Sequence, residues 1–117
     1  MNTKSLTETR VGNDETIRPT QQAATVHDVL LLRLLALLDA TMRETWMPMS
    51  FRTVVVQEFP TIRRELSKRK SDLSLVESRV MHILDAADPY RGFAERSEAL
   101  LALRMLHGEL AATRFAA

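Results

Sequence analysis

The segment from Val26 to Met42 restricts most strongly how this chain can fold. It reads VHDVLLLRLLALLDATM, and at 100° per residue its apolar side chains point in nearly every direction around a helix. A helix that is apolar almost all round is typically buried, but Arg33 and the flanking charges leave this one short of the ~20 apolar residues of a membrane span. Because so short a chain has little other material to bury this helix, we expect a second copy of the chain or a protein partner to cover it.

Composition narrows the class of protein. A chain of 117 residues is at most one small domain with a modest core, for which oligomerisation is a common source of stability. The net charge of +1 gives no overall field that would attract nucleic acid. The chain has no cysteine and begins without an apolar signal region, so we expect a cytoplasmic protein without disulfides.

The polar and apolar pattern divides the chain in two. Residues 1–24 follow neither a helical nor a strand period, which predicts a flexible polar tail. Residues 25–117 predict a helical domain, whose first helix begins after a Thr25 N-cap and ends near Glu44. The expected fold is an all-α bundle of three or four helices, as a homodimer.

Two prolines mark the predicted boundaries of the middle helices. Pro48 ends the first helix, and a Ser50 cap starts a short helix over residues 51–59. Pro60 opens a third helix over residues 61–87, and its apolar seam alternates steps of three and four with one exception at Arg69. An interruption at residues 71–77 is the alternative, because Ser71-Asp72 or the capping-box pattern of Ser74 and Glu77 could begin a new helix.

A turn and a last helix complete the pattern. The sequence DPYRG over residues 88–92 is typical of a turn, and it precedes a last helix over residues 93–114. The apolar stripe of that helix consists of Ala99, Leu103, Leu106 and Leu110.

No motif indicates an enzyme. His27, His82 and His107 have no metal-ligand spacing, and the acids around residues 85–98 suit helix caps and first turns. The chain also lacks a glycine-rich phosphate loop and a nucleophile–base arrangement. We therefore expect no catalytic residue, no metal and no cofactor.

The apolar surplus predicts two interfaces. The first is a protein-binding surface, rich in methionine and with the only tryptophan, residue types that suit adaptable surfaces and binding hot spots. Its predicted members are Leu31, Leu32, Leu35, Met42, Trp46, Met47, Met49 and Phe51. The second is a homodimer interface, with Leu34, Leu38, Leu66, Leu73, Val76 and Val80 as its predicted members.

Basic residues in the predicted third helix form a stripe of local positive charge. Its members are Arg63, Arg64, Lys68, Arg69 and Lys70. Such a stripe can orient an acidic protein partner, and the alternative is a DNA-binding regulator that uses a basic helix over residues 61–79. A second alternative is a dimeric secretion-type chaperone that holds an unfolded segment in an apolar groove.

Three stretches together carry a resemblance: the leader MNTKSLTETR, the leucine-rich VHDVLLLRLLALLDATM and the junction WMPMSF. With its helical remainder, the chain resembles small bacterial quorum-sensing anti-activators of LuxR-type transcription factors. The resemblance implies a helical homodimer that binds the ligand-binding domain of the regulator, disrupts its dimer and prevents DNA binding. It implies no particular functional residue.

Overall fold

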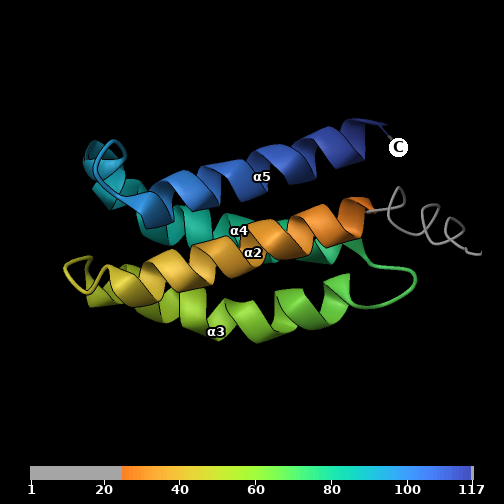
Figure 1. Ribbon diagram of the computed structural model, residues 1–117, viewed down its shortest axis with the longest axis horizontal. Helices are drawn as coiled ribbons and strands as arrows, with labels where there is room; N and C mark the ends of the chain where they lie inside the picture. The colour runs from red at the N-terminus through yellow and green to blue at the C-terminus, as the bar shows by residue number, and fades with distance from the viewer. Residues whose placement is uncertain (1–24, 117) are drawn as a thin grey trace, which may run out of the picture.

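Four helices form an antiparallel bundle in the computed structural model, which describes residues 25–116 (Figure 1). The tail predicted over residues 1–24 lies outside this range. The elements are α2 (Val26–Arg43), α3 (Met49–Leu66), α4 (Leu73–Ala87), the 3₁₀ helix η1 (Asp88–Phe93) and α5 (Glu98–Ala116). The prediction of an all-α bundle is confirmed.

Each helix of the bundle contacts two neighbours along its length. α2 packs against α3 and α5, and α4 packs against the same two helices. Successive helices run in opposite directions (Figure 1). In the same view, α2 and α4 lie between α5 on one side and α3 on the other. α2 thereby buries one side and keeps an outer side facing solvent.

The core consists of one row of apolar residues from each helix. The stripe predicted for the last helix is buried, with Ala99, Leu103, Leu106 and Leu110 each at most 1% exposed. The seam of the predicted third helix is also buried or nearly so, although it is divided between α3 and α4. The fully buried large side chains are Phe51, Leu30, Leu34, Leu37, Ile62, Ile83, Leu103, Leu106, Leu110, Val55, Val76 and Val80.

The first helix begins and ends as predicted. Thr25 accepts a hydrogen bond from the backbone N–H of Asp28, and the Asp28 carboxylate accepts one from the N–H of Thr25. This reciprocal capping box satisfies two amides at the start of α2. The helix ends at Arg43, and Glu44 is its C-cap.

Pro60 does not begin a helix, and the predicted boundary between two helices at this residue is wrong. α3 continues through Pro60 from Met49 to Leu66, and the predicted Ser50 cap is replaced by Pro48. A proline inside a helix leaves the carbonyl four residues earlier without its bond. Here that residue is Val56. Because Val56 is 47% exposed and Pro60 is also exposed, water can form a hydrogen bond with the free carbonyl.

The prediction of a continuous helix over residues 61–87 is also wrong. The alternative, an interruption at residues 71–77, lies close to the observed break. α3 ends at Leu66 and α4 begins at Leu73. Asp72 is the N-cap of α4, because its carboxylate accepts hydrogen bonds from the backbone N–H groups of Ser74 and Leu75 at 3.0 and 3.2 Å. The cap satisfies α4 amides that a break would otherwise leave unpaired.

Glu65 holds the turn between α3 and α4. Its carboxylate accepts a hydrogen bond from the backbone N–H of Asp72 at 2.7 Å and one from the Lys68 ammonium at 3.0 Å. Both bonds favour the ionised carboxylate, and the bond from Asp72 contributes most to lowering the pKa of Glu65 below its ordinary value of 4.5. The carboxylate thus stabilises the turn more strongly in its charged form than in its neutral form.

We expect the stability of this turn to decrease in acid. Because the pKa of Glu65 is lower in the folded state, its contribution is present above pH 4.5 and is lost as the pH falls below that value. The melting temperature of the wild type should therefore fall more between about pH 6 and pH 3 than that of a Glu65→Gln variant. Thermal melts followed by circular dichroism measure the difference, and parallel curves for the two proteins would contradict the prediction.

The last helix begins later than predicted. Residues 88–93 form the 3₁₀ helix η1, and α5 starts only at Glu98. Just before it, the Ser97 hydroxyl accepts a hydrogen bond from the backbone N–H of Leu100.

Gly108 lies inside α5 and is exposed. A Cβ at this position would meet no atom within 4 Å, so the glycine is not needed for a close contact between helices of the chain.

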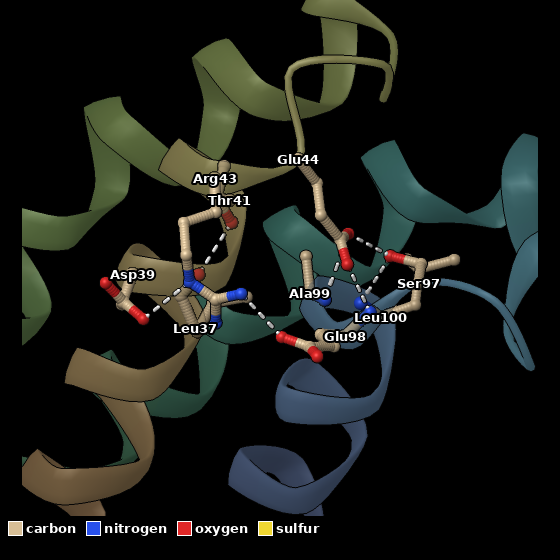
Figure 2. A network of polar contacts seen from close by, with 9 residues as sticks. All are labelled: Leu37, Asp39, Thr41, Arg43, Glu44, Ser97, Glu98, Ala99 and Leu100. Carbon is tan, nitrogen blue, oxygen red and sulfur yellow. Dashed lines mark hydrogen bonds and ion pairs between the residues drawn. The ribbon is translucent and has the colours of Figure 1, made fainter.

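A buried carboxylate joins the end of α2 to the start of α5 (Figure 2). Glu44 is 8% exposed, and it accepts hydrogen bonds from the Ser97 hydroxyl at 2.7 Å and from the backbone N–H groups of Glu98 and Ala99 at 2.5 and 3.2 Å. It therefore caps α5 from outside that helix, at the end where the dipole favours a negative charge.

Beside this cap, Arg43 connects the same two helices at the surface. Its guanidinium contacts the Glu98 carboxylate at 2.8 Å and the Asp39 carboxylate at 3.0 Å. Both bonds raise the pKa of Arg43 above its ordinary value, and the bond to Glu98 has the larger effect.

Candidate protein-binding site

The outer side of α2 exposes apolar side chains to solvent beside the charged Asp39 and Arg43. Leu32 is 67% exposed, Leu35 is 48% exposed and Met42 is 56% exposed, whereas Leu31 is half-buried. The opposite side of the same helix supplies the core through residues such as Leu30, Leu34 and Leu37. The helix therefore has apolar residues on both sides, and one chain covers only one of these sides.

α3 extends this apolar surface next to the C-terminal half of α2. Met49 is 68% exposed and Val56 is 47% exposed. Together with Met42 they line a shallow groove of about 250 Å³, which we call the α2–α3 groove. Its lining residues are Thr41, Met42, Met49, Arg52, Thr53, Val56 and Gln57.

The α2–α3 groove is lined mainly by uncharged side chains. Its only charged lining residue is Arg52, whose Nε donates a hydrogen bond to the Thr41 carbonyl at 3.2 Å and thereby ties α3 to α2. The lining contains no carboxylate, histidine or other group that could act as a general base. Exposed methionines suit a surface that adapts to a partner side chain.

Trp46 lies in the connection after α2 and is 53% exposed. Its ring packs edge-on against Phe93 of η1 at 6.1 Å between centroids, and the Arg96 guanidinium lies 5.8 Å from the centre of the Phe93 ring. This aromatic pair adds apolar surface that a partner could cover.

Two of the predicted protein-binding residues are in the wrong place for that role. Met47 is 2% exposed and Phe51 is 0% exposed, so both belong to the core. The WMPMSF sequence alternates between surface and interior, and only Trp46 and Met49 of its large apolar residues are exposed. A partner that docks on the folded chain cannot reach Met47 or Phe51.

The predicted dimer-interface residues are also misplaced. Leu34, Leu66, Val76 and Val80 are at most 2% exposed, and Leu38 and Leu73 pack against the core at its edge. Leu66, Val76 and Val80 are buried within one chain because the break at residues 67–72 folds α4 back onto α3. The seam that resembled an interface between copies is an interface between helices of one chain.

The basic stripe is exposed but is not a single helix. Arg63 and Arg64 lie in the last turn of α3, and Lys68, Arg69 and Lys70 lie in the connection to α4. Arg79 is on α4, where it contacts Glu58 of α3 at 3.4 Å. The DNA-binding alternative requires a continuous basic helix over residues 61–79. This prediction is wrong, because α3 ends at Leu66 and α4 begins at Leu73.

A second apolar surface lies between α2 and α5, and sequence reasoning missed its α5 members. Leu101 is 51% exposed and Met105 is 40% exposed. They line a shallow hollow of about 290 Å³ beside Ala36 of α2 and Ala102 of α5. Leu101 and Met105 fall outside the buried stripe of the last helix, and this off-stripe position was the available signal.

Within residues 25–116, no group of three His, Asp or Glu side chains is arranged to hold a metal ion. His82 contacts the Glu58 carboxylate at 2.5 Å. In the same part of the chain, no helix combines the length and hydropathy needed to cross a membrane.

Comparison of the chain with models of protein families, with curated protein sequences and with solved structures gave no match.

Proposed function

We propose that this chain is a regulatory protein that acts by binding another protein through the α2–α3 groove. The observation that carries the proposal is the concentration of exposed Met42, Met49 and Val56 around one groove without reactive groups. Exposed apolar residues that gather beside one another are typical of interaction sites, whereas scattered ones need no explanation.

The resemblance to quorum-sensing anti-activators names a LuxR-type transcription factor as the candidate partner. In this proposal the chain binds the folded regulator and prevents its dimerisation, so that the regulator cannot hold DNA. A secretion-type chaperone is the second candidate function, because an apolar groove can also hold an unfolded segment. Binding of a folded regulator with defined stoichiometry favours the first candidate, and binding of unfolded segments alone favours the second.

The proposed function predicts that a charge placed in the groove weakens binding. Met42→Lys should weaken binding to a LuxR-type regulator encoded in the same genome by at least about tenfold, since a hot-spot residue commonly contributes more than 1.4 kcal/mol. Isothermal titration calorimetry with purified regulator measures the affinity, and release of the regulator from operator DNA measures the activity.

The matched control is Met81→Lys. Met81 is 41% exposed on α4, away from the α2–α3 groove, so the same substitution there should leave binding unchanged. If no such regulator binds, or if both variants bind as the wild type does, the proposed function is wrong.

We also propose that two copies associate through the surface between α2 and α5. Charges on this surface are paired within the chain, with Arg33 contacting Glu109 at 3.4 Å and Arg43 contacting Glu98 at 2.8 Å. Because these pairs neutralise one another around exposed Leu101 and Met105, a second copy meets apolar area without net repulsion.

Self-association is tested with Leu101→Glu. In light scattering coupled to size exclusion, the wild type should have twice the mass of one chain and the variant the mass of one. Leu101 is 51% exposed, so the variant should keep its helical circular dichroism. A monomeric wild type, or a variant that remains dimeric, would contradict this interface.

A further inference from the structure

The apolar groove continues into positive charge along the outer face of α3. Met49, Val56 and Arg63 are each seven residues apart, and residues at this spacing share one face of a helix. Arg64 follows in the same turn, and Arg69 and Lys70 follow in the connection to α4. A ligand that lies along α3 would therefore meet methionine and valine first and cations next.

Among the described residues, acidic side chains do not neutralise these cations. Arg63, Arg64, Arg69 and Lys70 have no ion-pair partner within residues 25–116, and all four are exposed.

The two acids of α3 are turned inward. Glu58 is 5% exposed and contacts Arg79 and His82 of α4, and Glu65 is 6% exposed and bonds to the turn. The outer face of α3 thus has positive charge without compensation from its own helix.

We infer that the α2–α3 groove takes an acidic amphipathic helix of the partner protein. Its apolar side chains contact Met42, Met49 and Val56, and its carboxylates face Arg63, Arg64 and the loop cations. This inference rests on the proposed function and specifies which segment of a partner would bind. α3 has 18 residues and spans about 27 Å, so the bound segment is a helix of about five turns.

A protein segment fits this surface better than a nucleic acid does. Phosphates would pair with the cations but would leave the apolar groove uncovered, and the net charge of +1 provides little long-range attraction for DNA. An amphipathic helix covers both parts at once, because apolar anchors at helical spacing bury the groove while charges at its edge orient it.

The test uses the full chain and three fluorescent probes. Two are helical peptides of about 20 residues with identical leucines at helical spacing, one with glutamates and one with lysines at the polar positions. The third is a DNA duplex of about 20 base pairs. In anisotropy titrations at low salt, the acidic peptide should bind at least about tenfold more tightly than the basic peptide, and the DNA more weakly than the acidic peptide.

Variants assign the binding to the surface. Removing charge with Arg63→Gln/Arg64→Gln, or reversing it with Arg69→Glu/Lys70→Glu, should each weaken the acidic peptide about five- to tenfold. Met42→Gln, which removes apolar contact without adding charge, should weaken both peptides. The matched control is Arg104→Gln, an exposed cation on α5, which should change nothing.

Each contrary result overturns a defined statement. Equal binding of both peptides, no binding of the acidic peptide, or no effect of Met42→Gln overturns the inference. DNA that binds more tightly than the acidic peptide and responds to the charge variants assigns the cations to nucleic acid and overturns it too. The proposed function is measured separately with the LuxR-type regulator, so intact regulator binding beside failed peptides overturns only the acidic-helix assignment.

Discussion

Replacing Phe51 by alanine should lower the free energy of unfolding by about 3–5 kcal/mol, the range for large aromatic residues removed from a packed core. Phe51 is 0% exposed in the first turns of α3 and belongs to the central cluster with Leu37, Val55 and Ile62. Its removal leaves a cavity that a four-helix bundle can only partly close. Urea denaturation followed by circular dichroism measures the loss.

The control for this prediction is Met49→Ala, two residues earlier on the same helix. Met49 is 68% exposed, so its truncation should change stability by less than about 0.5 kcal/mol. The pair also separates core from interface, because Met49→Ala should weaken partner binding while the fold stays intact. A stable Phe51→Ala variant that fails only in binding would show that Phe51 is an interface residue, as its sequence context suggested.

Replacing Glu44 by alanine should cost about 2–4 kcal/mol, because it removes a buried carboxylate that accepts charge-assisted hydrogen bonds. The substitution leaves the backbone N–H groups of Glu98 and Ala99 without their acceptor, and it also removes the partner of the Ser97 hydroxyl. Glu44→Gln keeps one acceptor oxygen, so we expect a smaller loss of about 1–2 kcal/mol.

Hydrogen exchange provides the local readout for Glu44. The amides of Glu98 and Ala99 should exchange faster in Glu44→Ala, whereas amides in the middle of α3 should change only with global stability. The control is Asp39→Ala, which removes an exposed partner of Arg43 and should cost less than about 0.5 kcal/mol. Equal stabilities of Glu44→Ala and Asp39→Ala would contradict the role of Glu44 as the cap of α5.

The sequence predicted helices correctly where the signal depends only on residues that are neighbours in the chain. The Thr25 cap and the apolar rows of α2 and α5 were found because capping and helical period are properties of neighbouring residues. Pro60 was misjudged because its effect depends on whether the carbonyl of Val56 reaches water, which is decided by the position of α3 at the surface.

The candidate binding residues were only partly predictable for the same reason. Met42, Trp46 and Met49 are exposed as expected, but Met47 and Phe51 are buried, and Leu101 and Met105 were missed. Sequence spacing cannot show which of two apolar sides of α2 another helix covers. In addition, Glu44 and Ser97 are 53 residues apart, and no local pattern relates them.

The sequence by itself determined that this chain is helical, where its first helix begins and that it has more apolar helical surface than one buried side requires. The tertiary structure alone decided which leucines are covered, because the turn held by Glu65 and Asp72 folds α4 against α3 and converts a predicted dimer seam into a core. Secondary structure follows from interactions between residues a few positions apart, whereas burial depends on which distant segments come to lie against them.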